Sequence, residues 1–113
     1  MTDFTLTLTA SPFSSDQHER AQRFMAAALA QPEHRVLQVF FYQDAVLAAL
    51  PDQATQTVWS ELAAQANCPL YVCVSAAERR GINNAQAPWE IVGLGDWVSG
   101  LSLGRHLQFG GGA

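Results

Sequence analysis

The stretch Leu70–Gly81 reads Leu-Tyr-Val-Cys-Val-Ser-Ala-Ala-Glu-Arg-Arg-Gly, and it decides the fold that we expect for this chain. Five residues of strand-forming character, Leu70–Val74, precede Ser75-Ala76-Ala77-Glu78, whose S-x-x-E spacing is typical of a capping box at a helix start. Gly81 suits the left-handed position that ends such a helix. The pattern predicts that Cys73 lies where a strand gives way to a helix, at the sheet edge where reactive groups collect in α/β proteins.

The segments before this stretch alternate between strand and helix patterns. Phe4–Thr9 alternates apolar and polar β-branched residues, whereas Val36–Tyr42 is almost continuously apolar, as expected of a parallel strand covered on both faces. Between them, the apolar residues from Ala21 to Leu29 follow a helical repeat, which Ser15 or Asp16 can cap. This order predicts a parallel strand-helix-strand unit.

Further helical patterns lie on either side of Leu70–Gly81. Thr55–Asn67 predicts a second amphipathic helix, and Leu94–Leu101 a last short one before a brief strand at Leu107–Phe109. Ile82–Pro88 is polar and turn-like. A short helical turn is expected from Asp44 to Leu50, and its apolar side chains either pack on their own domain or face a partner.

These patterns together predict one α/β domain over residues 1–109, followed by a flexible Gly-rich tail at 110–113. We expect an open, mainly parallel sheet of about four to five strands with helices on both faces, related to the flavodoxin fold. If the strand order is of the 2-1-3 type, Cys73 lies at the rim of the topological switch point.

The composition narrows the class of protein. Residues are 49% hydrophobic and only 14% charged, which suggests oligomerisation because little charge is left to cover the surface. The formal net charge of −4 argues against a nucleic-acid-binding surface. No apolar run approaches the roughly 18 residues of a membrane span, and the N-terminus lacks the pattern of a secretory signal. We therefore expect a cytoplasmic protein.

Cys73 is the candidate reactive group, with two interpretations. A cysteine in an apolar strand is commonly a small, inert core residue, but a helix N-terminus just beyond it would favour the thiolate. Arg79 and Arg80 could add to this effect or attract an anionic sulfur donor, or simply be solvated. Cys68 precedes a proline at the far end of the same strand, too distant for a disulfide, and is expected to be structural.

The sequence contains no pattern typical of a metal site, a nucleotide-binding site or a serine-hydrolase site. The three histidines, His18, His34 and His106, lie on separate elements without a carboxylate or cysteine at ligand spacing, so we expect no metal site. No Gly-rich phosphate loop and no G-x-S-x-G elbow occurs, so no nucleotide cofactor is expected.

The run Val72–Ile82 closely resembles the C-V-A-A-A-x-R-R-G segment of the DsrE/TusD sulfurtransferase family. Val39–Tyr42 resembles the V-F-F-Y second strand of that family, and Gly93–Gly95 with a closing Gln108-Phe109 resembles its C-terminal part. The resemblance therefore covers nearly the whole chain.

The chain also departs from the family pattern. Ser11 replaces an expected Gly, Ser75 replaces an Ala, and Cys68 has no counterpart in the family motif. The segments between Asp44 and Thr55 and between Gly81 and Gly93 are short. Because loops commonly carry partner contacts, the short segments bear on the identity of the partners.

The resemblance implies a DsrEFH-like fold and a sulfur-relay protein, in which Cys73 accepts sulfane sulfur as a persulfide and passes it to a partner's cysteine. It implies sulfur-donor and sulfur-acceptor proteins as partners, and related subunits in a hetero-oligomer, such as a heterohexamer, or a homo-oligomer. No direct contact with nucleic acid or membrane is implied. The pathways served by such proteins are tRNA 2-thiouridine synthesis and dissimilatory sulfur oxidation.

Two other functions stay open at this point. The chain could be a non-catalytic interaction subunit of such an assembly, with Cys73 merely packed in the core. It could also be a small-molecule or nucleotide binding module that uses the crevice at the sheet edge, although it lacks a phosphate-cradling loop.

Overall fold

The structure, a computed structural model, describes residues 2–14, 16–51, 53–101 and 104–110. Its centre is a sheet of five parallel strands in the order β4-β3-β2-β1-β5. The strands are β1 (Thr2–Leu8), β2 (His34–Phe41), β3 (Leu70–Cys73), β4 (Trp89–Val92) and β5 (Arg105–Phe109). This confirms the predicted parallel α/β sheet.

The strand order differs from the 2-1-3 type. β3 pairs with β2 and β4, so β2 separates it from β1. The order of strands reverses between β1 and β5, and Cys73 does not lie at that switch point. The connections from β1 to β2, from β2 to β3 and from β3 to β4 each join neighbouring strands. Local sequence patterns do not predict which strands become neighbours.

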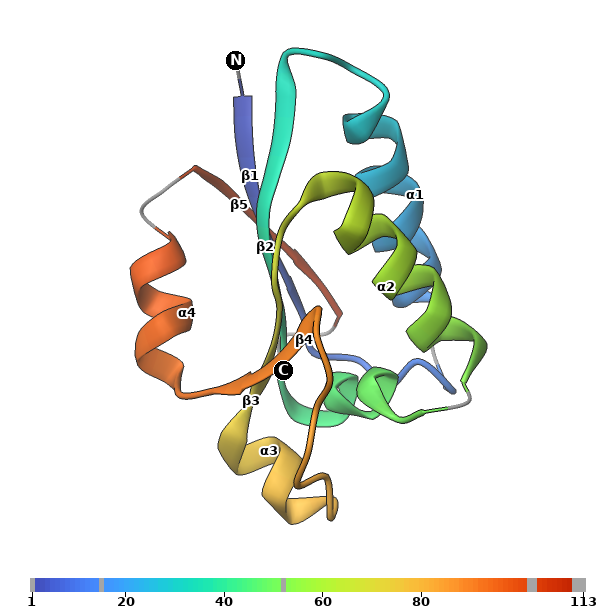
Figure 1. The fold of residues 1–113 in the computed structure, drawn as a ribbon, viewed down its shortest axis with the longest axis vertical. Coiled ribbons are helices and arrows are strands. Elements are labelled where there is room, and N and C mark those ends of the chain that lie inside the picture. The colour runs from blue at the N-terminus through green and yellow to red at the C-terminus, as the bar shows by residue number, and fades with distance from the viewer. Residues whose placement is uncertain (1, 15, 52, 102–103, 111–113) are drawn as a thin grey trace.

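Helices cover both faces of the sheet, as predicted. α1 (Gln17–Leu29) and α2 (Ala54–Ala66) lie on one face, and α4 (Leu94–Leu101) lies on the other (Figure 1). Two neighbouring residues of β2 show the division: the ring centroid of Phe41 is 5.2 Å from that of Trp59 on α2, and the centroid of Phe40 is 5.8 Å from that of Trp97 on α4. Successive side chains of a strand point to opposite faces, so β2 is buried between the two layers.

Two short helices extend from the carboxyl edge of the sheet. The 3₁₀ helix η1 (Gln43–Ala49) follows β2, and α3 (Val74–Arg79) follows β3 (Figure 1). In η1, Val46 and its small neighbours Ala45 and Ala48 are fully buried. Of the two interpretations of this apolar turn, packing on its own domain is therefore confirmed.

Two local details differ from the expectations drawn from the sequence. β4 was not predicted, because its four residues follow a polar, turn-like stretch and are too few to show a period. Asp16 is the N-cap residue of α1 but makes no side-chain capping bond, since its carboxylate pairs with Arg20 at 3.0 Å. Ser15 and the tail residues 111–113 lie outside the described residues; Gly110, which the tail was predicted to include, follows β5 with φ +122°.

In the part of the chain that the structure describes, no helix combines the length and the apolar character needed to cross a membrane.

His18, the second residue of α1, is buried against Trp59 of α2, and both of its ring nitrogens are hydrogen-bonded. Its Nε2–H donates to the carbonyl of Ala10 at 2.7 Å, and its Nδ1 accepts from the indole N–H of Trp59 at 3.2 Å. These bonds suit the neutral ring. Burial lowers the pKa of His18, against a smaller opposing effect of the hydrogen bond to Ala10.

We expect this histidine to make stability depend on pH. Above the unfolded-state pKa of about 6.5 both states hold a neutral ring, and below it the unfolded chain takes up a proton that the folded chain resists. The free energy of unfolding should therefore fall with decreasing pH below about 6.5, by at most about 1.4 kcal/mol per pH unit from this residue. Urea titrations between pH 5 and 8 measure the free energy of unfolding and its slope with pH. The slope should shrink in His18→Gln and persist in His34→Gln; equal slopes in all three proteins would contradict the assignment.

Candidate functional site

Strand pairing brings Cys73 to the carboxyl edge of the sheet. β3 is held between β2, with Phe41 opposite Val72, and β4, with Val92 opposite Cys73. α3 begins at the next residue, Val74. The prediction that Cys73 lies at a strand-to-helix junction is therefore confirmed.

The predicted capping box at Ser75 is wrong. The ladder to β4 ends at Cys73, so no strand pairing holds Val74 extended, and the helix starts one residue before Ser75. Cys73 itself is the N-cap residue, with extended backbone (φ −62°, ψ 125°) and no side-chain capping bond. Ser75 is an exposed residue of the first turn.

The end of α3 follows the prediction. Gly81 has φ +72°, and its N–H donates to the carbonyl of Glu78, while the N–H of Ile82 donates to Ala77. These two bonds form a Schellman motif, which requires the left-handed residue that glycine supplies. α3 is thus limited to six residues.

A pocket of about 250 Å³ opens beside Cys73 at this edge. Its lining comes from the chain just after three neighbouring strands: Tyr42, Gln43, Cys73, Ser75, Ala76, Arg79, Arg80 and Leu94. Cys73 as a residue is only 1% exposed, and this pocket is where it borders open space. The carboxyl ends of parallel strands are where α/β proteins bind ligands, although this site is not at the switch point.

The pocket wall formed by η1 is tied to α3. Arg80 donates from Nη2 and Nε to the carboxylate of Asp44, at 2.6 and 3.1 Å, and from Nη1 to the carbonyl of Ala76 at 2.9 Å. Gln43, next to Asp44, has φ +52°, a left-handed conformation that costs a non-glycine residue of order 1–3 kcal/mol. The Asp44–Arg80 pair therefore holds a strained backbone segment against the helix that follows Cys73.

Cys68 lies in a different environment from Cys73. It precedes β3 at the opposite edge of the sheet and lines a separate pocket of about 420 Å³ with Pro69 and Pro88. Both cysteines are free thiols. Burial raises the pKa of the Cys68 thiol to about 12, which keeps it protonated at neutral pH.

The three histidines remain apart in the fold. His18 is in the first turn of α1, His34 begins β2, and His106 on β5 is hydrogen-bonded to Thr7 at 2.7 Å. Among the described residues, no three His, Cys, Asp or Glu side chains come together in a group that could hold a metal ion.

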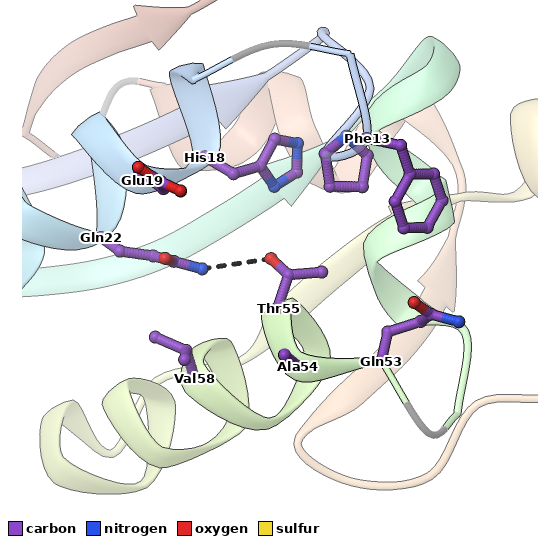
Figure 2. A pocket seen from close by; sticks show the side chains of 9 residues that line it. Phe13, His18, Glu19, Gln22, Gln53, Ala54, Thr55 and Val58 are labelled. Carbon is purple, nitrogen blue, oxygen red and sulfur yellow. Dashed lines mark hydrogen bonds between the residues drawn. The ribbon is translucent and has the colours of Figure 1, made fainter.

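A further pocket, of about 350 Å³, was not predicted from the sequence. It lies between the starts of α1 and α2, where the amide of Gln22 donates to the hydroxyl of Thr55 at 3.2 Å (Figure 2). Phe13 and Val58, both substantially exposed, contribute its apolar part. The sequence around Pro12, which lines this pocket, indicated only a loop. Neither cysteine lines the pocket.

The sequence profile of the DsrE/DsrF-like family matches residues 3–109, nearly the whole chain. The chain belongs to the DsrE/DsrF-like family. The resemblance of the cysteine-bearing segment to this family is thereby confirmed. The match spans all five strands apart from the first residue of β1.

Relatives within the family are sulfurtransferases by name. The chain is 35% identical to a sulfurtransferase TusD homolog of Pseudomonas aeruginosa, covering 88% of this chain and 92% of that protein. It is 37% identical to the sulfurtransferase TusD of Serratia proteamaculans, covering 96% of this chain and 100% of the relative. It is 32% identical to a putative sulfurtransferase DsrE of Allochromatium vinosum, covering 95% of this chain and 98% of that protein.

The alignments to the last two relatives extend over 132 and 128 positions, more than the 113 residues of this chain, so both contain gaps in this chain. Among solved structures, the ychN protein of E. coli matches with a TM-score of 0.82 at 23% identity, covering 96% of this chain and 100% of that chain. At that identity the likeness shows the fold alone.

The two cysteines should differ in reactivity towards iodoacetamide at pH 8. With a pKa of about 12, only about one Cys68 in 10,000 is a thiolate at that pH, so Cys68 should be alkylated only after unfolding. Cys73 has the pocket as its access route and should be alkylated in the folded protein. Peptide mass spectrometry after timed quenching gives both rates. Equal rates at the two cysteines in the folded protein would contradict this interpretation.

Proposed function

We propose that this protein is a sulfur-relay sulfurtransferase that carries sulfane sulfur as a persulfide on Cys73. The observation that supports this most is the position of Cys73, which ends β3 and lines the pocket at the carboxyl edge. The names of the family's sulfurtransferases support the general activity. Cys68 is a poor candidate because burial keeps its thiol protonated.

The proposed chemistry consists of two thiol exchanges. The Cys73 thiolate attacks the outer sulfur of a donor persulfide, a new S–S bond forms, the donor S–S bond breaks, and the donor leaves as a thiolate. An acceptor thiolate then attacks the outer sulfur on Cys73, and Cys73 is released as a thiolate. No electrons are gained or lost overall, so this relay needs no redox cofactor. The bound sulfur simply changes its carrier.

The proposal includes protein partners in the cytoplasm. The donor and the acceptor are proteins with reactive cysteines. Related subunits assemble with this chain in a hetero-oligomer, such as a heterohexamer, or in a homo-oligomer. Leu94 and Val98 support a subunit contact, since they lie on α4 and are 44% and 58% exposed. The pathway served is tRNA 2-thiouridine synthesis or dissimilatory sulfur oxidation.

One observation favours a second candidate, a non-catalytic interaction subunit. Cys73 as a residue is 1% exposed, which is the burial of a core residue. In such a subunit the cysteine would fill space between β3 and α3, and the exposed apolar side chains of α4 would carry the function. A Cys73→Ser variant that keeps full sulfur flux in the reconstituted assembly would favour this candidate.

Incubation with a persulfide donor should add about 32 Da, the mass of one sulfur atom, to Cys73. The adduct should be absent in Cys73→Ser, because that variant lacks the accepting sulfur, and present in Cys68→Ser. Intact-protein and peptide mass spectrometry measure the mass and its location. Dithiothreitol should remove the added mass, as it reduces a persulfide.

Circular dichroism on both variants provides the control that they fold. An unmodified Cys73 in the presence of an active donor, or an adduct that survives in Cys73→Ser, would contradict the proposed function.

A further inference from the structure

The two arginines at the end of α3 line the same pocket but have different surroundings. Arg80 is one-quarter exposed, and its guanidinium pairs with Asp44 and with the carbonyl of Ala76. Its charge is therefore balanced by a carboxylate, and its position is fixed by η1 on one side and α3 on the other. Arg80 has a structural role in the pocket wall.

Arg79 is the uncompensated charge of the pocket. Its side chain is exposed, and within the described part of the chain it makes no hydrogen bond or ion pair. No carboxylate lines the pocket, and Arg80 is the other basic residue of its lining. With Arg80 balanced by Asp44, the lining carries one net positive charge beside Cys73.

Charges around a pocket of this size act on one another over less than about 10 Å, which is comparable to the Debye length of about 8 Å at physiological salt. A cavity of about 250 Å³ is smaller than a site for a drug-sized molecule, but it has room for the terminal atoms of a donor and for one added sulfur. A partly desolvated anion here would find its counterion in Arg79.

We propose that Arg79 is the charge-selecting residue of this site. It favours donors whose transferable sulfur carries negative charge, such as a persulfide in its anionic form, and then holds the charged outer sulfur once it is bonded to Cys73. This inference rests on the proposed function of Cys73. It makes Arg79 a positioning residue, which acts by its charge and forms no bond to sulfur.

The test compares two alkylating reagents of similar size and different charge. The rate of Cys73 alkylation is measured with iodoacetate, which is anionic, and with iodoacetamide, which is neutral, and the ratio of the two rates reports the local charge. In Arg79→Gln the ratio should fall about two- to fivefold, as expected for a charge interaction exposed to solvent. Arg79→Lys should restore most of it, and high salt should reduce the difference.

The matched control is Arg23→Gln, which removes the same formal charge from an exposed site on α1, where Arg23 lies 3.6 Å from Glu19. Its ratio should equal that of the wild type. An equal fall in Arg79→Gln and Arg23→Gln, or no fall in either, would overturn the inference, as would a Cys73 that neither reagent alkylates in the folded protein.

Sulfur loading separates this inference from the proposed function. If Cys73 takes up sulfur and the ratio of the two alkylation rates is the same in Arg79→Gln as in the wild type, only the selection by charge is wrong. If Cys73 takes up no sulfur from an active donor, the proposed function fails, and charge selection for sulfur donors fails with it whatever the reagent ratio. Slower loading of Arg79→Gln by an anionic persulfide, together with the fall in the reagent ratio, supports both.

Discussion

The pairing of β3 between β2 and β4 is the constraint on which the site depends. Those two ladders hold the chain extended as far as Cys73 and no further, because the last residue pair with β4 joins Cys73 to Val92. The chain turns into α3 at the next residue, so the thiol is fixed at the carboxyl edge by the register of a buried sheet. A site positioned by strand pairing is more rigid than one carried on a free loop.

The rest of the pocket is organised around that fixed sulfur. The segment after β2 supplies one wall and is tied to α3 by the Asp44–Arg80 pair, while the segment after β4 contributes Leu94. The Schellman motif at Gly81 ends α3 immediately after the two arginines. The two adjacent arginines therefore have different roles. Arg80 joins η1 to α3, and Arg79 contributes a positive charge that no carboxylate of the pocket lining balances. This division gives a buried thiol an access route that favours anions.

Much of the fold could be predicted from local patterns, and the failures have physical causes. Apolar runs identified β2 and β3, helical periodicity identified α1 and α2, and the glycine at position 81 marked the end of α3. Strand order could not be predicted, because pairing partners are distant in sequence. Gly100 interrupts the helical pattern of α4, and a Cβ there would lie 2.1 Å from the side-chain amide of Gln38, so a larger residue would require that amide to move. The position of Cys73 was predictable, whereas the different surroundings of the two arginines were not, because Asp44 lies 36 residues from Arg80.

The most direct measurement of the central claim is a crystal structure of the protein after reaction with a persulfide donor, under conditions where its mass has risen by one sulfur. A second sulfur atom should lie about 2.05 Å from Cys73 Sγ, the length of an S–S bond, and project into the pocket with Arg79. A bare thiol at Cys73, with the added sulfur on Cys68 or elsewhere, would contradict sulfur carriage at this site.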